Sequence, residues 1–208
     1  NGLTSITIGN NVTTIGHGAF YGCGNLTSVH ISDIAVWCKI EFEGQWSNPL
    51  ESAQHLYING KEITELIIPN GVTILDDNAF CNCTSLTSVT IPSSVTSIGD
   101  ESFSGCTNLT LVNIGSSVTS IGSFAFRNCT SLISVTIGDN VTTIGYAAFR
   151  DCSNIKEVTS YIIEPIYIFD ETFDFSNENF NAILFVPVES VQKYEAAEGW
   201  KNFKEIIP

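Results

Sequence analysis

The sequence predicts a β-rich repeat solenoid with short helical or turn segments, and three observations support this fold class. Four copies of a 23-residue segment follow each other without a gap from residue 63 to residue 154, and an earlier copy occupies residues 3–25. Seven apolar positions recur in the copies, and a single isolated coil could not bury that many side chains. Two of these positions alternate with a polar one, as in a half-buried strand. We therefore expect stacked coils in which each core residue lies on its counterpart in the next coil.

Each copy has the pattern of two short extended pieces joined by turns. In the second of the four copies, Val89-Thr90-Ile91 favours a strand, because β-branched residues suit a pleated surface. The Ser93-Ser94 pair follows at a turn position, where other copies carry Asn or Gly. Residues 95–98 form the second extended piece, and a compact turn or short helix then carries Phe103. The seven recurring positions in this copy are Leu86, Val89, Ile91, Val95, Ile98, Phe103 and Cys106.

The whole repeat pattern, with paired Val and Ile positions followed by Ala-Phe and Cys, resembles the BspA-like leucine-rich repeats of bacterial and protist surface proteins. The resemblance covers nearly the whole chain, with small departures such as Leu75-Asp76 in place of Ile-Gly and Ser102 in place of Ala. It implies a leucine-rich-repeat right-handed superhelix that is closed by a C-terminal cap. The Phe and Cys positions are filled by Phe20, Phe80, Phe103, Phe126 and Phe149 and by Cys23, Cys83, Cys106, Cys129 and Cys152.

Residues 1–161 are expected to form the solenoid, with an elaborated repeat at residues 26–62 that continues the stack. In this repeat a short helix should begin at Ser32 or Asp33, which are good helix N-caps. The Asn59-Gly60 pair fits the two-residue turn of a β-hairpin. Trp37 and Trp46 are expected to be packing residues, with a ligand platform as the alternative.

Strict periodicity ends at Ile162, and residues 162–208 are expected to form a capping segment continuous with the solenoid. The end of a solenoid exposes core and backbone edge and therefore needs an atypical unit. Residues 183–185 have the pattern of a last strand, and a helix should run from Glu189 or Ser190 to Glu198. The expected inner face of this segment consists of Val191, Tyr194, Trp200 and Phe203.

The charge balance excludes some classes of partner. The net charge is −14, with 22 acidic residues against 8 basic ones. Nucleic-acid binding requires basic side chains that neutralise phosphates, so no nucleic-acid partner is expected. No apolar run approaches the roughly 20 residues that span a bilayer, so no transmembrane segment is expected either.

The seven cysteines allow two interpretations. In a chain suspected of being extracellular they suggest disulfides, but five of them recur at one repeat position beside core residues. Side chains that lie side by side in a ladder fit disulfide geometry poorly, and a free cysteine packs as a small apolar residue. We expect a reduced structural ladder, and a cysteine row of this kind does not provide tetrahedral zinc ligands.

No motif points to catalysis, a metal or a cofactor. The histidines, His17, His30 and His55, belong to no HExxH sequence, and no GxSxG sequence occurs. Asp170, Glu171 and Asp174 are a candidate Ca²⁺ cluster, but solvated surface acids are the simpler interpretation. We therefore expect neither an enzyme nor a cofactor-binding protein.

The outward residues of the first strand of each coil are the candidate binding face, since solenoids bind partners on broad repeated surfaces. The expected function is a non-enzymatic binding module, secreted or attached to the cell surface or outer membrane. It would act as an adhesin or interaction scaffold for a protein or glycan on host or neighbouring cells. The alternative is an architectural spacer that displays another domain and has no ligand of its own. The candidate face consists of Ser88, Thr90, Leu111, Asn113, Ser134 and Thr136.

Overall fold

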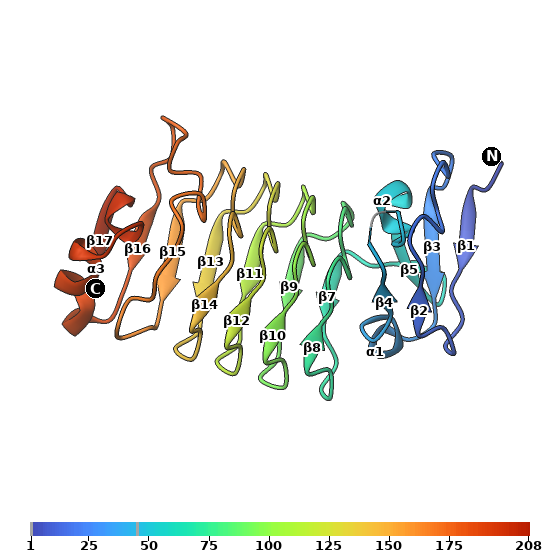
Figure 1. The fold of residues 1–208 in the computed structure, drawn as a ribbon, viewed down its shortest axis with the longest axis horizontal. Helices are drawn as coiled ribbons and strands as arrows, with labels where there is room; N and C mark the ends of the chain where they lie inside the picture. The colour runs from blue at the N-terminus through green and yellow to red at the C-terminus, as the bar shows by residue number, and fades with distance from the viewer. Residues whose placement is uncertain (1, 45) are drawn as a thin grey trace.

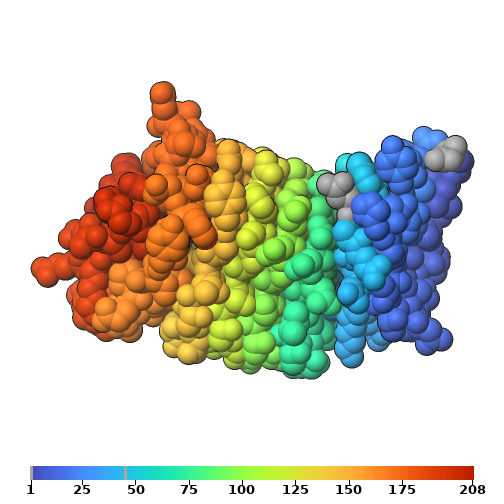
Figure 2. Space-filling view, in the orientation of Figure 1, coloured from blue at the N-terminus to red at the C-terminus, as the bar shows by residue number. Residues whose placement is uncertain are grey.

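The computed structural model describes residues 2–44 and 46–208, which form an elongated stack of coils (Figure 1). The chain runs from one end of the rod to the other, and successive coils lie side by side along the long axis. In the space-filling view each coil forms a band across the rod (Figure 2). The predicted solenoid is therefore confirmed.

From residue 65 onward, the first strand of each coil joins a parallel, seven-stranded sheet with the order β17-β16-β15-β13-β11-β9-β7. Its register follows the repeat, since Val112 pairs with Val89 on one side and with Val135 on the other. Like residues therefore lie next to like residues along the sheet. The strands are β7 (Glu65–Ile67), β9 (Ser88–Thr90), β11 (Leu111–Asn113), β13 (Ser134–Ile137), β15 (Glu157–Ser160), β16 (Ile183–Phe185) and β17 (Glu205–Ile207).

In the four consecutive repeats, the second extended piece forms a four-stranded parallel sheet with the order β14-β12-β10-β8. Each of its strands has only two residues, so the predicted piece at 95–98 is regular only at Ser97 and Ile98. The strands are β8 (Ile74–Leu75), β10 (Ser97–Ile98), β12 (Ser120–Ile121) and β14 (Thr143–Ile144).

A column of phenylalanine rings fills the interior between the sheets and the turns. The column consists of Phe80, Phe103, Phe126 and Phe149. The centroids of neighbouring rings lie 5.2–5.3 Å apart, and the planes of neighbouring rings differ by 9° or less. Phe173 extends the column beyond the last full repeat, 5.1 Å from Phe149. The Phe103, Phe126 and Phe149 column that the repeat predicts is confirmed.

The third side of each coil is a tight turn, which settles the alternative between a turn and a short helix. Backbone amides on this side donate to the next coil, for example from Phe80 to the Ser102 carbonyl (2.8 Å) and from Phe103 to the Ala125 carbonyl (2.8 Å). The turn has two left-handed positions, which include Glu101 (φ 54°) where an earlier copy has Gly18 (φ 71°). All sides of the coil are thus hydrogen-bonded to neighbouring coils.

The hydroxyl-rich surface also links the coils. The Thr110 hydroxyl donates to the Thr87 carbonyl (2.9 Å), and the Thr119 hydroxyl donates to the Thr96 carbonyl (3.1 Å), each one period earlier. The Asn154 amide donates in the same way to the Thr130 carbonyl (2.7 Å). These side chains therefore do more than keep the surface polar, because they add hydrogen bonds between neighbouring coils to those of the backbone.

The elaborated repeat contains the expected helix and hairpin. Helix α1 (Ile34–Trp37) is capped by Asp33, whose carboxylate accepts the Ala35 amide, and a second helix, α2 (Leu50–Ala53), follows. Asn59 and Gly60, both with positive φ, form the turn between β5 (Leu56–Ile58) and the antiparallel β6 (Lys61–Glu62). The remaining strands of this end are β1 (Ser5–Thr7), β2 (Thr14–Ile15), β3 (Ser28–Ile31) and β4 (Glu41–Phe42).

The elaborated repeat shares one hydrophobic core with the coils that follow, but the strand ladder is interrupted on its C-terminal side. Strand β6 ends a separate sheet of order β1-β3-β5-β6, and β7 begins the seven-stranded one. The hairpin turns the chain back, so no strand pairing connects the two sheets. Buried side chains bridge the junction instead, since the Trp37 indole donates to the Ala79 carbonyl (2.9 Å) and the Asn48 amide to the Asn78 carbonyl (2.7 Å). Trp37 is a packing residue as expected, whereas Trp46 is exposed and contacts Tyr21 edge-on.

The C-terminal segment continues the seven-stranded sheet through β16 and β17. The expectation that residues 183–185 are the last strand is wrong, because Glu205–Ile207 pairs beyond them. The predicted helix is shorter than expected: the 3₁₀ turn η1 (Val188–Ser190) leads into α3 (Val191–Ala196), and η2 (Trp200–Asn202) follows. Tyr194, Trp200 and Phe203 are buried, as expected for an inner face. This segment covers the end of the phenylalanine column, since Phe203 contacts Phe173 (5.1 Å).

Candidate functional site

The six residues of the predicted binding face form one contiguous block, which we call the central block. Parallel pairing places Leu111 between Ser88 and Ser134, and Asn113 between Thr90 and Thr136. The block is thus two rows of three side chains on the outer face of β9, β11 and β13. Thr90, Leu111 and Asn113 are exposed, while the other three are half-buried.

The central block carries no charge, but acids flank it. Glu65 of β7 and Glu157 of β15 continue the row of Ser88, Leu111 and Ser134 on either side. Exposed apolar side chains lie beside the block, among them Ile67 (70% exposed) and Ile133 (49%). A hollow of about 470 Å³ adjoins it and is lined by Thr136 together with Ile114, Ser116, Gly138, Asp139, Tyr161, Ile163 and Pro187.

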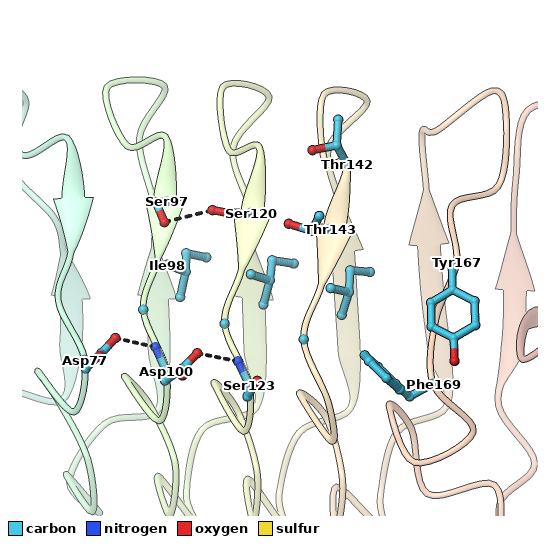
Figure 3. Close-up of a pocket in the computed structure, with 15 residues that line it drawn as sticks. Asp77, Ser97, Ile98, Asp100, Ser120, Ser123, Thr142, Thr143, Tyr167 and Phe169 are labelled. Atoms are coloured by element: carbon cyan, nitrogen blue, oxygen red, sulfur yellow. Dashed lines mark hydrogen bonds between the residues drawn. The ribbon is translucent and has the colours of Figure 1, made fainter.

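A second surface feature lies on the four-stranded sheet, and sequence reasoning missed it. It is a groove of about 610 Å³ that crosses the outer face of β10, β12 and β14 (Figure 3). We call it the glycine groove, because Gly99, Gly122 and Gly145 lie along its floor. Its remaining lining residues are Asp77, Ser97, Ile98, Asp100, Ser120, Ile121, Ser123, Thr142, Thr143, Ile144, Tyr167 and Phe169.

Close approach of successive coils explains the glycines. A methyl group at Gly122 would lie 2.5 Å from the Gly99 carbonyl carbon and 2.6 Å from the Asp100 amide nitrogen. The same methyl group at Gly16, the equivalent position in the first copy, would meet nothing closer than a Glu43 carboxylate oxygen at 3.6 Å. Glycine is therefore needed where the backbone of another coil lies directly against it, and Asp76 occupies this position after the hairpin, where β8 pairs with β10 alone among the described strands.

Two aromatic residues line the groove at its C-terminal end, beside the edge strand β14. Ile168 is buried as Ile144 is, one residue later than the 23-residue period places it. Tyr167 and Phe169 on either side of Ile168 therefore face outward, where earlier coils have a hydroxyl and a glycine. Figure 3 shows both rings beside β14. An alignment of the repeats that allows one inserted residue before Ile168 would have predicted from the sequence that Tyr167 and Phe169 face outward.

The cysteines are structural in this fold. All seven are free, and all but Cys23 are buried. The Cys106 thiol donates to the Phe80 carbonyl (3.3 Å), and Cys129 makes the same bond to Phe103 (3.3 Å). Burial raises the pKa of Cys38 to about 12 and that of Cys83 to about 11. The reduced ladder predicted from the sequence is present.

These thiols should react slowly in the folded protein, because the thiolate is the reactive form and buried thiols are inaccessible. We expect an aromatic disulfide reagent to label Cys23 quickly at pH 8 and the six buried cysteines only after unfolding. The slow phase should follow the rate of unfolding, because burial raises the pKa of Cys83 to about 11 and leaves little thiolate in the folded protein at pH 8. Stopped-flow absorbance with and without denaturant measures both phases. Rapid reaction of several thiols in the native protein would show that the coils are not closed as described.

The titratable side chains do not assemble a reactive site in the described part of the chain. His30 stacks on Tyr57 (4.8 Å), and His55 Nδ1 pairs with a Glu62 oxygen (2.5 Å). Asp170, Glu171 and Asp174 line a surface hollow that includes Arg150. Among residues 2–44 and 46–208, no three His, Cys, Asp or Glu side chains are grouped as metal ligands. No helix within these ranges has the length and apolarity to cross a membrane.

Comparison with known proteins identifies the repeat. The family model for the BspA type leucine rich repeat region matches residues 1–41 and 53–182 in six copies. A leucine-rich repeat protein from Bacteroides ovatus is 32% identical, with a TM-score of 0.51 over 76% of this chain, and the match spans 37% of that protein's chain. No curated protein matches the chain.

Two more distant structures share the fold alone. The leucine-rich repeat protein TpLRR of T. pallidum is 23% identical over 69% of this chain and 68% of its own, with a TM-score of 0.50. The pneumococcal vaccine antigen PcpA is 16% identical over 99% of this chain and 55% of its own, with a TM-score of 0.62. With its repeats, its stacked coils and these matches, the chain belongs to the BspA-type leucine-rich repeat family.

Proposed function

We propose that the chain is a non-enzymatic binding module, secreted or attached to the cell surface, that docks a protein partner on the central block. The observation that carries the proposal is the block itself: two uncharged rows of side chains in strict register, with an apolar hollow beside them. Interfaces of this kind gain affinity from a buried centre with a polar rim. The family is generally non-catalytic, which agrees with a binding role.

The flanking acids favour a partner with basic residues around its contact surface. Glu65 and Glu157 lie on opposite sides of the block, and the chain as a whole carries a net charge of −14. Complementary charges at a rim increase the rate of association and help to set orientation. The cysteines are compatible with a location outside the cell, because six of the seven are buried and thus protected from oxidants.

A matched pair of arginine substitutions tests the proposal. Thr90→Arg places a long charged side chain within the block, whereas Ser93→Arg places it in an exposed turn of the same coil. Binding of purified extracellular-matrix and cell-surface proteins is measured by biolayer interferometry at two salt concentrations. We expect saturable, salt-sensitive binding that Thr90→Arg weakens about tenfold or more and Ser93→Arg leaves unchanged. Absence of any protein ligand would instead favour the spacer role, and equal effects of the two variants would remove the block as the docking site.

A further inference from the structure

We propose that the glycine groove is a carbohydrate-binding site that takes a linear, neutral oligosaccharide and stacks one of its rings on Tyr167. This site lies on a different sheet from the central block and does not depend on the protein-docking role proposed above. Its floor, its open end, its aromatic wall and its charge each favour this class of ligand.

The floor of the groove presents hydroxyl groups at the spacing of the coils. Strand pairing aligns Ser97, Ser120 and Thr143 in one row, and the Ser97 and Ser120 hydroxyls are bonded to each other (2.8 Å). The coils repeat at the 5.2–5.3 Å spacing of the phenylalanine rings inside them. A pyranose ring in an extended oligosaccharide has nearly the same length. A periodic polymer of hydroxyl-bearing rings therefore meets a periodic row of hydroxyl partners.

The C-terminal end of the groove is an open edge of the sheet. In the preceding coils Thr119 and Thr142 donate their amides to the carbonyls of Thr96 and Thr119, one period earlier. Because one residue is inserted before Ile168, the counterpart of Thr142 is Ile166, and its amide makes no bond to the Thr142 carbonyl. Within residues 2–44 and 46–208, no protein donor reaches the Thr142 carbonyl. An exposed carbonyl of this kind accepts a hydrogen bond from a ligand hydroxyl.

Aromatic rings form the wall at this open end. Tyr167 is 71% exposed, and its ring lies edge-on to Phe169 (5.2 Å), which in turn contacts Tyr146 (5.7 Å). Phe169 thus contacts the Tyr167 ring on one side, and most of the Tyr167 side chain stays open to solvent. Binding sites commonly combine an apolar surface with a few convergent polar groups. A pyranose matches that combination, with C–H bonds on its faces and hydroxyls around its rim.

The charge of the groove selects a neutral ligand over an anionic one. No lysine or arginine is among its lining residues, whereas Asp77 and Asp100 are. Each carboxylate uses one oxygen to accept a backbone amide of the next coil, at 2.7 Å in both cases. The second oxygen of each faces no donor from the described residues and can accept a ligand hydroxyl. A peptide strand fits less well, because the edge strand β14 offers only two residues for pairing.

Isothermal titration calorimetry on the full chain tests the site, with short linear oligosaccharides of glucose, mannose, xylose and N-acetylglucosamine as probes. We expect saturable binding of at least one of them and weaker binding of oligogalacturonate, the anionic comparison. Tyr167→Ala should weaken binding about tenfold, while Tyr167→Phe, which keeps the ring, should retain it. Tyr21→Ala is the matched control, since Tyr21 is equally exposed (72%) but lies at the other end of the rod.

The outcomes that overturn the proposal are distinct. Failure of every neutral oligosaccharide to bind, or undiminished binding by a correctly folded Tyr167→Ala variant, removes the site. Tighter binding of a neutral β-forming pentapeptide than of any oligosaccharide would identify the groove as a peptide site instead. The Thr90→Arg variant should bind the oligosaccharide normally, so that failure of the central block and failure of the groove are separated.

Discussion

Replacement of Phe126 by alanine is expected to destabilise the protein by about 3–5 kcal/mol, the range for removing a fully buried phenylalanine. Phe126 is completely buried, and its ring is stacked between Phe103 and Phe149 at 5.3 Å and 5.2 Å. Both neighbours are held by hydrogen bonds to adjacent coils, so the surrounding structure has little freedom to collapse into the space. The loss is therefore expected near the upper end of the range.

Urea unfolding followed by circular dichroism measures this loss, with the slope of the transition as a check on two-state behaviour. Leu111→Ala is a suitable control, because Leu111 is 39% exposed on an outer face and its removal leaves no cavity. We expect the control to change the unfolding free energy by no more than about 0.5 kcal/mol. A Phe126→Ala variant that is as stable as this control would show that the ring column is not the core.

The second large effect is expected from a single added methyl group. Gly122→Ala should destabilise the protein by about 1–3 kcal/mol or more, since the new methyl group would overlap the backbone of the preceding coil. The Asp100 amide nitrogen, 2.6 Å from that methyl carbon, is already bonded to an Asp77 oxygen and cannot move away freely. The coils would have to separate locally to accept the substitution.

Gly16→Ala provides the control at the same repeat position. A methyl group there would meet only a Glu43 carboxylate oxygen at 3.6 Å, and alanine is expected to be neutral or stabilising by less than about 1 kcal/mol, because it restricts the unfolded chain. Thermal unfolding of both variants beside the parent protein gives the comparison. Equal melting temperatures for the two variants would contradict the close approach of coils that explains the glycine row.

The parts of the fold that the sequence predicts are those that repeat. Val89 in one coil and Val112 in the next occupy the same environment, so the period alone predicts that they pair, and they do. The same reasoning places Phe126 in a column and the outward residues of β9, β11 and β13 in one block. The hairpin at Asn59-Gly60 was also predictable, because this pair has a strong local preference for a two-residue turn.

The features that escaped prediction depend on contacts with no local signal. Glu101 adopts a left-handed backbone conformation (φ 54°) that its residue type does not favour, because the bonds to the next coil impose it. The strand ladder is interrupted between β6 and β7 because of the direction in which the hairpin leads the chain. The hydrogen bond from Trp37 to the Ala79 carbonyl, which bridges this interruption, joins residues 42 positions apart in the sequence. The glycine groove was missed because its wall, Tyr167 and Phe169, lies where one extra residue shifts the period.

The central claim, that like side chains stack in register from coil to coil, is tested most directly by double-mutant cycles along the ring column. The cycle for Phe103→Leu with Phe126→Leu joins rings that are in contact at 5.3 Å. The cycle for Phe80→Leu with Phe149→Leu joins members of the column separated by two intervening rings. We expect a coupling free energy of about 0.5 kcal/mol or more for the first pair and additivity within about 0.5 kcal/mol for the second. Additive effects for Phe103 and Phe126, or stronger coupling for Phe80 and Phe149, would contradict the stacked arrangement.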